Sequence, residues 1–186
     1  MTKVLLDMAM SLDGFISTSD GSDAGLYDWY FDESNPVDQA AVKEIVAISG
    51  AIVLGRGAFG LGEDSGGFDD TPYDVDHFVI THRPPATPPG NPRIRFVTTG
   101  IEDAIAAAKK SAGDRYATVG GGADIAQQLL AAGLVDEIAL HIAPIVLGTG
   151  LALFTGLPNR LDLRQTRTIA GERALHVWYE VTKRAT

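Results

Sequence analysis

Short apolar segments alternate with amphipathic ones along most of the chain, and glycine or proline separates them. Mostly apolar runs predict buried β-strands at 3–10, 51–54, 77–81, 94–98, 116–119 and 135–143. Apolar residues at helical spacing predict helices at 37–49, 101–111 and 123–132. Strands that alternate with helices in this way are typical of an α/β fold, whose crossovers give a mainly parallel sheet.

The end of the chain has a different pattern. Segments 163–170 and 174–182 flank Gly171-Glu172-Arg173, which is typical of a β-hairpin and predicts antiparallel strands at one edge of the sheet. Segment 83–92 holds five of the nine prolines and is predicted to be an extended internal connection. No linker divides the chain, so we expect one domain over residues 1–186.

Three residues mark the ends of the first long helix. Asn35 fits an N-cap, Pro36 fits the first helical position, and Gly50 fits a C-cap.

The composition narrows the class of protein further. The chain has 186 residues, of which 45% are apolar and 21% charged, and it has no cysteine. A chain of this size can bury a core without a staple, and the lack of Cys excludes a disulfide framework, a thiolate zinc site and a cysteine nucleophile. Fifteen basic and 24 acidic residues give a net charge of −9, which does not favour nucleic-acid binding. Neither a signal-peptide pattern nor a membrane-spanning run is present, so we expect a cytoplasmic protein.

Three consecutive glycines form the most specific motif. The segment Tyr116-Ala-Thr-Val-Gly-Gly-Gly-Ala-Asp-Ile-Ala leads from a predicted strand through Gly120, Gly121 and Gly122 into a predicted helix. Glycine lets a phosphate approach the backbone, and the helix N-terminus offers free N–H groups and a partial positive charge. A tight turn alone would not need three glycines, because each one costs conformational entropy. The segment therefore favours phosphate binding over a purely structural turn.

A second glycine motif follows the strand at 51–54. Gly55, Gly57 and Gly60 fit the spacing G-x-G-x-x-G, and acids follow about 20 residues later at Asp74 and Asp76, as in a dinucleotide fingerprint. The residues after Gly60 do not predict the long helix that such a fingerprint opens, so a Rossmann site is not supported. Arg56 could contact a phosphate or lie exposed in a turn, and the local sequence leaves both open.

Polar residues follow two further strands. Thr81, His82 and Arg83 come after the strand at 77–81, where ligands bind in open α/β sheets. An Arg there can hold the 2′-phosphate that distinguishes NADP from NAD, and a solvated loop is the alternative. Asp13 follows the first strand, where it could face a substrate, although Asp13-Gly14 is first of all a turn signal.

Other candidate chemistry is less specific. Four aromatic residues before the first long helix could wall a planar ligand or pack in a core or subunit interface: Tyr27, Trp29, Tyr30 and Phe31. The acid-rich stretch 63–76 is predicted to be a solvated loop. The four histidines lack metal-ligand spacing, and His141 and His176 lie in strand patterns that favour a structural role. We therefore expect no metal site.

Taken together, these segments resemble the dihydrofolate reductase-like superfamily. Within it, the likeness is to the C-terminal reductase domain of bifunctional riboflavin-biosynthesis deaminase-reductases and its stand-alone relatives. It rests on Met10-Ser-Leu-Asp-Gly-Phe-Ile, on Ile52-Val-Leu-Gly-Arg and on the block that begins Val119-Gly-Gly-Gly-Ala-Asp-Ile-Ala and continues through Ala143-Pro-Ile-Val-Leu-Gly-Thr-Gly. The resemblance covers nearly the whole chain. It implies a three-layer α/β/α fold with a mainly parallel, twisted sheet and a C-terminal antiparallel hairpin.

The resemblance also implies an NADPH cofactor, a small heterocyclic substrate and a homodimer, which suits the apolar run 138–147. The implied cofactor residues are Gly55 and Arg56 near the phosphates, Thr81, His82 and Arg83 at the 2′-phosphate, and Gly120, Gly121, Gly122, Ala123 and Asp124 at the pyrophosphate. The expected substrate residues are Met10, Ser11, Trp29 and Phe59.

One departure from the family pattern concerns the proton donor. Folate-reducing members use a carboxylate on the first long helix to hold and help protonate the pteridine ring. The nearest acid here is Asp38, about one residue out of register counted back from Gly55, at the N3 position where capping explains an acid. The candidate proton donors are Asp13, Asp38 and water, in that order, and we do not expect true dihydrofolate reductase activity.

The sequence thus predicts an NADPH-dependent reductase that transfers a hydride to a C=N or C=O bond of a pteridine- or pyrimidine-like substrate. One candidate substrate is 5-amino-6-(5-phosphoribosylamino)uracil, whose phosphate would need basic groups that stretch 63–76 does not supply. The alternative is a catalytically inactive nucleotide-binding protein of the same fold. The zinc deaminase pattern of the bifunctional proteins does not occur in this chain.

Overall fold

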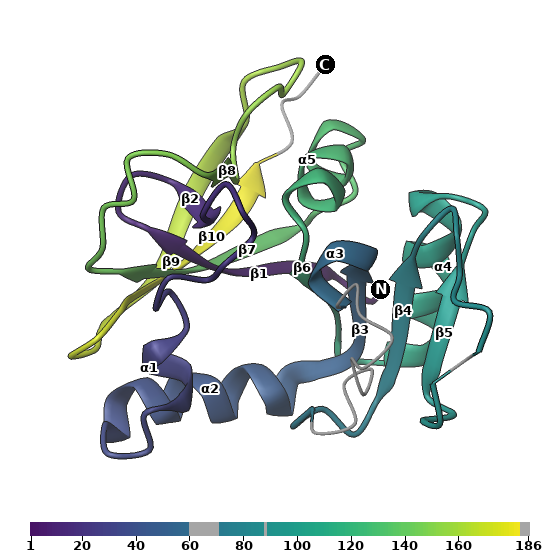
Figure 1. Ribbon diagram of the computed structural model, residues 1–186, viewed down its shortest axis with the longest axis horizontal. Helices are drawn as coiled ribbons and strands as arrows, with labels where there is room; N and C mark the ends of the chain where they lie inside the picture. The colour runs from purple at the N-terminus through teal and green to yellow at the C-terminus, as the bar shows by residue number, and fades with distance from the viewer. Residues whose placement is uncertain (60–70, 88, 183–186) are drawn as a thin grey trace.

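The computed structural model describes residues 1–59, 71–87 and 89–182, and its centre is one eight-stranded sheet (Figure 1). The strands are β1 (Val4–Ser11), β3 (Ser49–Gly55), β4 (Asp76–Ile80), β5 (Ile94–Val97), β6 (Tyr116–Gly121), β7 (Glu137–Ala143), β9 (Asp162–Ala170) and β10 (Leu175–Thr182). Their order is β5-β4-β3-β6-β1-β7-β10-β9. The six strands from β5 to β7 run parallel, whereas β10 is antiparallel to β7 and β9 is antiparallel to β10.

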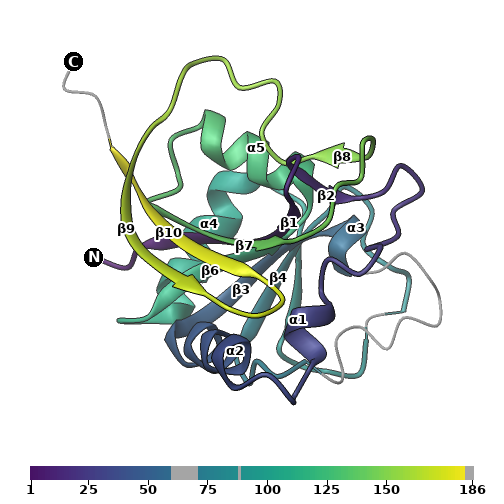
Figure 2. The ribbon, with the colours of Figure 1, turned by 90° about the vertical axis from the view of Figure 1, so that its left-hand side faces the viewer.

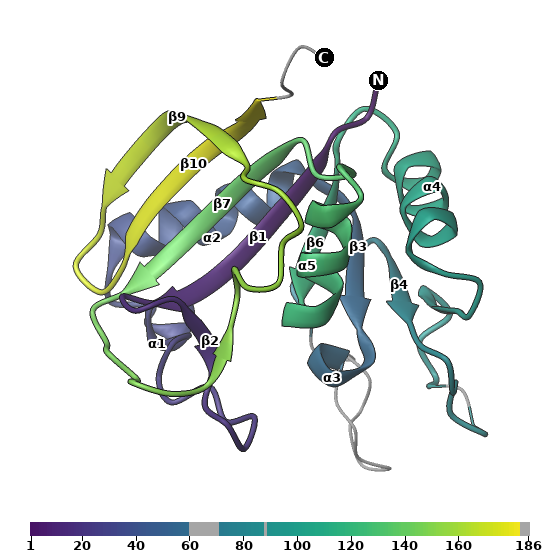
Figure 3. The same ribbon diagram turned by 90° about the horizontal axis from the view of Figure 1, so that it is seen from above.

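Helices cover both faces of this sheet (Figures 2 and 3). Helix α2 (Pro36–Ile48) lies on one face, and α4 (Ile101–Ala112) with α5 (Ala123–Ala131) lies on the other. Because side chains alternate along a strand, β1 sends Leu6 and Met8 into the core beneath α4 and α5, and Leu5 and Ala9 into the core beneath α2. The predicted three-layer α/β/α fold with its C-terminal hairpin is confirmed.

Four short elements have no counterpart in the sequence pattern, because two to four residues cannot display a period. They are β2 (Phe15–Ser17), α1 (Asp28–Phe31), α3 (Arg56–Phe59) and β8 (Leu151–Ala152). Strands β2 and β8 pair with each other in a separate two-stranded sheet. Residues 60–70, which include Gly60 and most of the acid-rich stretch, lie outside the described residues.

The capping predictions for α2 have mixed outcomes. Asn35 is the N-cap as predicted, since its Oδ1 accepts hydrogen bonds from the N–H groups of Val37 at 3.1 Å and Asp38 at 3.2 Å. The prediction of Gly50 as the C-cap is wrong, because the C-cap is Ser49 and Gly50 lies inside β3. A glycine is needed there for a different reason: a Cβ on Gly50 would overlap the carbonyl oxygen of Ala112 at the end of α4.

The apolar run 138–147 is buried in its first part and more exposed after Ala143, where Val146 is an exposed hydrophobic residue. Ile138, Leu140 and Ala143 are buried in β7, which lies between β1 and β10. These residues cannot form the subunit interface for which the run was considered suitable, so homodimer formation stays a prediction without their support. Within the described residues, no helix combines the length and the apolar character needed to cross a bilayer.

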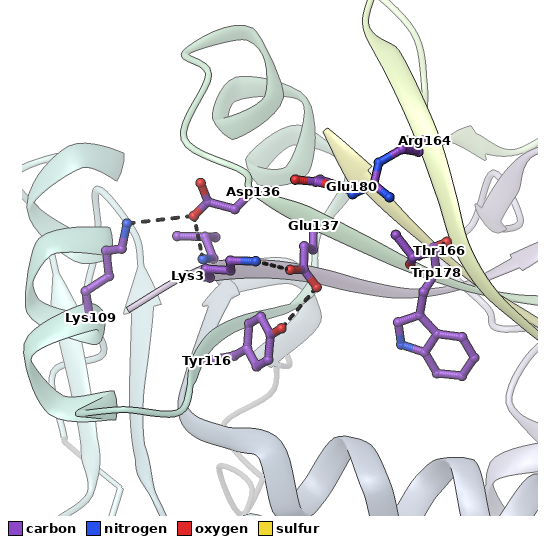
Figure 4. Close-up of polar contacts among 10 residues, drawn as sticks. Lys3, Lys109, Tyr116, Asp136, Glu137, Arg164, Thr166, Trp178 and Glu180 are labelled. Carbon is purple, nitrogen blue, oxygen red and sulfur yellow. Dashed lines mark hydrogen bonds and ion pairs between the residues drawn. The ribbon is translucent and has the colours of Figure 1, made fainter. Parts of the chain in front are cut away.

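A polar network closes the amino ends of the central strands (Figure 4). Glu137 accepts hydrogen bonds from Lys3 Nζ at 2.6 Å and from Tyr116 Oη at 3.0 Å. Asp136 accepts a hydrogen bond from the N–H of Val4 at 2.9 Å and lies 3.9 Å from Lys109 Nζ. Glu137 and Asp136 are therefore each matched by a lysine, whereas Glu180 on β10 pairs with Arg164.

The close approach of α4 to β3 predicts the effect of adding one methyl group. Gly50→Ala should lower the free energy of unfolding by about 1–3 kcal/mol, because backbone atoms of Ala112 would have to shift. Gly90→Ala is a matched control, since a Cβ there meets nothing within 4 Å and should change stability by less than about 0.5 kcal/mol. Urea denaturation measures both values, and equal stability of the two variants would contradict the packing argument.

Candidate functional site

A cleft of about 950 Å³ opens where the parallel strands β1, β3 and β6 reach their carboxyl ends. Its wall includes Met8 and Ala9 from β1, Ile52 and Leu54 from β3, and the turn that follows β6. This is the place where open α/β sheets bind ligands, and the volume lies within the range of small-molecule and cofactor sites.

The triple-glycine turn forms part of the cleft wall. Gly120, Gly121, Gly122 and Ala123 all line the cleft. Strand β6 ends at Gly121, and Gly122 is the N-cap of α5 with a φ of 94°, a conformation that favours glycine. A Cβ on Gly122 would lie 3.6 Å from the Cα of Gly55, so the two glycine segments that the sequence shows separately meet in the structure.

The predicted cationic residues also come together. The guanidinium of Arg56 donates a hydrogen bond to the backbone carbonyl of Arg83. Thr81 Oγ1 accepts a hydrogen bond from the N–H of Arg83 at 3.1 Å, which shapes the turn after β4. The side chains of His82 and Arg83 are exposed. None of these four residues is part of the described cleft lining, so they stand beside the cleft. Asp124 is exposed too, and its carboxylate accepts a hydrogen bond from Gln128 Nε2 at 2.7 Å.

The carboxylate of Asp13, the first catalytic candidate, connects two loops. It accepts hydrogen bonds from Ser11 Oγ at 2.6 Å and from the N–H groups of Leu147 at 3.1 Å and Gly148 at 2.7 Å. The hydrogen bond from Ser11, followed by those from the backbone, lowers the pKa of Asp13 and keeps it ionised. It ties the turn after β1 to the loop after β7, and an ionised carboxylate is a poor proton donor at neutral pH.

Asp38, the second candidate, is fully buried and is not a described lining residue of the cleft. Its Oδ1 lies 2.9 Å from His176 Nε2, and its Oδ2 accepts a hydrogen bond from the N–H of Arg173 at 3.1 Å. The capping explanation for this acid is wrong, because the N–H of Asn35 donates to the carbonyl of Asp32 and not to Asp38. The side chain turns into the interior instead.

The expected substrate residues divide between the cleft and the core. Trp29 lines the cleft beside Tyr27 and Tyr30, and its buried Nε1 has no hydrogen-bond partner within the described residues. Met10 lies in the core beneath α4 and α5, and Phe59 packs edge-on against Phe96 with ring centroids 5.6 Å apart. Neither Met10, Phe59 nor the buried Ser11 is among the described lining residues.

Two titratable residues of the cleft wall are missing from the sequence candidates. Asp7 on β1 and His141 on β7 both line the cleft, and Asp7 Oδ1 lies 2.7 Å from His141 Nε2. The signal for Asp7 was an acid inside an otherwise apolar strand, since charged residues are rarely placed in such strands without a partner. His141 gave no comparable signal, because its pairing depends on the strand register.

The electrostatic character of the cleft is acidic. The described lining residues include Asp7, Asp20 and Asp23 and no Lys or Arg. Burial, followed by the nearby charges of Asp7 and Asp23, raises the pKa of Tyr27 to about 12. Burial and Asp7 also raise the pKa of Tyr73, another lining residue, so both side chains are neutral phenols. In the described part of the chain, no group of three or more His, Asp or Glu side chains is arranged to hold a metal ion.

Comparisons with known proteins agree with this architecture. The family described as the RibD C-terminal domain matches residues 2–177. A putative riboflavin biosynthesis protein from Shewanella sp. PV-4 superposes with a TM-score of 0.77 at 24% identity, covering 97% of this chain and 99% of that one.

Two further structures share the fold. A diaminohydroxyphosphoribosylaminopyrimidine deaminase/5-amino-6-(5-phosphoribosylamino)uracil reductase from Thermotoga maritima has a TM-score of 0.66 at 16% identity, and the match covers 97% of this chain and 57% of that one. Dihydrofolate reductase from Enterococcus faecalis, complexed with NADP(H), has a TM-score of 0.64 at 18% identity over 97% of each chain. The chain thus spans little more than half of the Thermotoga protein.

The buried His176 makes stability depend on pH. Burial lowers the pKa of His176 below the ordinary 6.5. Below about pH 6.5, the folded protein therefore binds fewer protons at this residue than the unfolded chain does. The free energy of unfolding should therefore fall on acidification below about pH 6.5, by at most about 1.4 kcal/mol per pH unit from this group, with no contribution above that pH. Urea denaturation between pH 5 and 8 should give a shallower fall for His176→Gln. His82→Gln, which changes an exposed histidine, is the control, and a His176→Gln slope equal to that of the unsubstituted protein would contradict this reasoning.

Proposed function

Because the chain belongs to the RibD C-terminal domain family, reductases of the riboflavin pathway, we propose that it is an NADPH-dependent reductase that acts on a small heterocyclic substrate. It transfers a hydride to a C=N or C=O bond of a pteridine- or pyrimidine-like ring. The observation that carries this proposal is the glycine turn between β6 and α5, which presents backbone to a large cleft at the carboxyl edge of the sheet.

The residues around this turn fit a dinucleotide. Gly122 has no Cβ and opens α5, whose first N–H groups and partial positive charge suit a pyrophosphate. The buried Gly55 packs against Gly122 from the neighbouring strand and is not a described lining residue of the cleft. The turn itself presents backbone to the cleft and admits a bulky anion, which supports the roles suggested for residues 120–123.

The cations beside the cleft fit the additional phosphate of NADPH. Arg56 and Arg83 converge through a hydrogen bond from the first to the backbone of the second, and the Arg83 side chain is exposed and able to meet a ligand. A guanidinium pairs with phosphate through charge-assisted hydrogen bonds, which NADH would not offer at this position. We therefore assign the 2′-phosphate to Arg83, with Arg56 and the Thr81 turn holding the loop in place.

The wall of the cleft suits an uncharged planar ring. Trp29, Tyr27 and Tyr30 provide aromatic surface, and a carbonyl or ring nitrogen of the substrate would give the unpaired Trp29 Nε1 an acceptor. Bound NADPH supplies the hydride, and the protein binds, orients and shields the reactants from water. The acidic lining and the lack of Lys and Arg among the described lining residues favour a substrate without phosphate over 5-amino-6-(5-phosphoribosylamino)uracil.

One observation favours the alternative, a nucleotide-binding protein without catalysis. Neither Asp13 nor Asp38 lines the cleft among the described residues, so both carboxylates first considered as proton donors are engaged elsewhere. Binding and turnover must therefore be measured separately.

Fluorescence titration with NADPH and NADH tests the cofactor. We expect NADPH to bind with a Kd well below about 1 mM, a free energy more favourable than about −4 kcal/mol. Turnover is then followed by the loss of reduced nicotinamide absorbance with a panel of pteridines, pyrimidines and quinones, each phosphorylated compound paired with its dephosphorylated form. If neither cofactor binds below about 1 mM, the reductase proposal fails. If NADPH binds and no compound oxidises it, the result favours the non-catalytic alternative.

The choice between the two nicotinamide cofactors depends on Arg83. Arg83→Ala should weaken NADPH binding about 10- to 100-fold, as expected for one charge-assisted contact, and should change NADH binding little. Arg164→Ala, which removes an exposed arginine on β9 at the far edge of the sheet, is the matched control. Equal losses for NADPH and NADH would remove the 2′-phosphate role.

A further inference from the structure

Four titratable side chains form a continuous chain that leads from the cleft into the interior, and we call it the Asp–His relay. Asp7 Oδ1 lies 2.7 Å from His141 Nε2. His141 Nδ1 lies 2.6 Å from His176 Nδ1, and His176 Nε2 lies 2.9 Å from Asp38 Oδ1. The side chain of Asp7 is 15% exposed, whereas Asp38 and His176 are fully buried. The relay has one end that a ligand can reach and one end that it cannot.

The strand register produces this alignment. Strand β1 pairs with β7 so that Asp7 is opposite Ala139, which places Asp7 and His141 on the same face of the sheet. Strand β10 pairs with β7 so that His176 stands directly opposite His141. Helix α2, which carries Asp38, covers this same face (Figure 3).

The turn between β9 and β10 fixes the buried end of the relay. The N–H of Arg173 donates to Asp38 Oδ2 at 3.1 Å, which leaves Oδ1 for His176. Gly171 in this turn leaves the space that Asp38 occupies, because a Cβ at residue 171 would overlap the carboxylate. Asp38 is therefore held from two sides.

Counting protons shows what the relay must contain. Each of its three hydrogen bonds needs one proton, because carboxylate oxygens and imidazole nitrogens all offer lone pairs. Two neutral imidazoles supply only two protons. Filling all three hydrogen bonds therefore takes one additional proton, and the relay with that proton has a net charge of −1. Shifting each proton across its own hydrogen bond moves the negative charge from Asp7 to Asp38, or back, without breaking the chain of bonds.

The carboxylates that share the additional proton are not neutralised by any described lysine or arginine. Neither carboxylate of the relay has an ion pair with Lys or Arg within the described residues. By contrast, the carboxylates Glu137 and Asp136 at the opposite end of the same sheet are each matched by a lysine (Figure 4). Imidazoles pass protons near neutral pH, and a lysine ammonium does not.

The other groups that face the relay are the rings of Trp29 and Trp178, the phenols of Tyr27, Tyr30 and Tyr73, and the arginines Arg167 and Arg173. Trp29 packs against the ring of His141 with centroids 4.5 Å apart. Arg173 pairs its side chain with Asp32, and Arg167 pairs with Glu44.

Burial is the main cause that raises the pKa of Tyr27, Tyr30 and Tyr73, so these three phenols do not release protons near neutral pH. Burial also lowers the pKa of His176, which disfavours storing the additional proton there as an imidazolium.

We propose that Asp7 is the catalytic acid of this protein, and that His141, His176 and Asp38 are positioning residues that hold its proton. The inference rests on the proposed reductase function and supplies the proton donor that Asp13 and Asp38 do not provide directly.

The reaction balances with this assignment. The carbon of the C=N or C=O bond gains a hydride, the π electron pair moves to the nitrogen or oxygen, and that atom takes the proton from the carboxyl group of Asp7. NADPH is oxidised to NADP⁺ and the substrate is reduced. The Asp7 carboxylate is then reprotonated by water at the open end of the cleft, which restores the hydrogen bond between Asp7 and His141.

Kinetics of three variants test the assignment with whichever compound of the panel is reduced. Asp7→Asn should lower kcat about 100- to 10,000-fold, as expected for loss of a general acid, with NADPH affinity retained. Asp38→Asn removes a negative charge that favours the additional proton, so the fall of kcat at high pH should move to lower pH by about one unit. Glu137→Gln is the matched control, because this carboxylate lies on β7 at the other end of the sheet and should leave the pH profile unchanged.

A merely structural role of Asp38 would lower kcat without moving the pH profile. Circular dichroism checks that each variant folds. If Asp7→Asn does not fold, the pH profile of Asp38→Asn decides. Full activity of a folded Asp7→Asn variant, or an unchanged pH profile of Asp38→Asn, would overturn the proposal.

A second measurement needs neither cofactor nor substrate. Nitrogen NMR of isotope-labelled histidine rings in the full chain should show His141 and His176 titrating as one unit. Asp38→Asn should change the ring-nitrogen chemical shifts of His141, which Asp38 does not touch, and Glu137→Gln should not. Independent titration of the two histidines would disprove the relay even in an active enzyme. Coupled titration together with no turnover would overturn the reductase function and the catalytic role of Asp7 while leaving the relay in place.

Discussion

The parallel pairing of the central strands is the constraint on which the site depends. Because β3, β6 and β1 all run in one direction, their carboxyl ends meet at one edge, and the turns after β3 and β6 approach each other there. Gly55 and Gly122 lie against each other there, and a Cβ on Gly55 would come within 2.9 Å of Ile125 Cγ1 on α5. The same alignment places β7 beside β1, so one constraint positions both the phosphate-binding turn and the polar residues beneath α2.

Positive and negative side chains occupy different parts of this edge. Arg56 and Arg83 lie beside the cleft, while the acids Asp7, Asp20 and Asp23 lie in its wall. In a chain with a net charge of −9, a bound dinucleotide gains most where those two arginines and the helix N-terminus meet. At the acidic wall, an uncharged ring avoids the repulsion that a phosphorylated substrate would meet.

The sequence predicts the fold well because strand and helix periods, the Asn35 cap and the closing hairpin are local signals. It predicts the phosphate turn because three glycines in a row have few structural explanations. It does not predict the relay, because Asp7, His141, His176 and Asp38 are brought together by strand register and by helix packing across more than a hundred residues of sequence. Asp38 also satisfied a local explanation, helix capping, that hid its buried partner. The C-cap prediction for Gly50 was wrong for a similar reason. The local sequence fits a cap, but glycine is needed there because the end of α4 lies against it.

The way this protein buries carboxylates also explains why the polar cluster is retained inside a core. An isolated buried carboxylate is strongly unfavourable, and pairing it with a buried lysine or arginine would still carry a large desolvation cost. Two carboxylates joined by two imidazoles spread a single negative charge over four groups, each with its hydrogen bonds satisfied. In the proposed mechanism, Asp7 at the cleft end of this relay donates a proton to a ring that binds without charge.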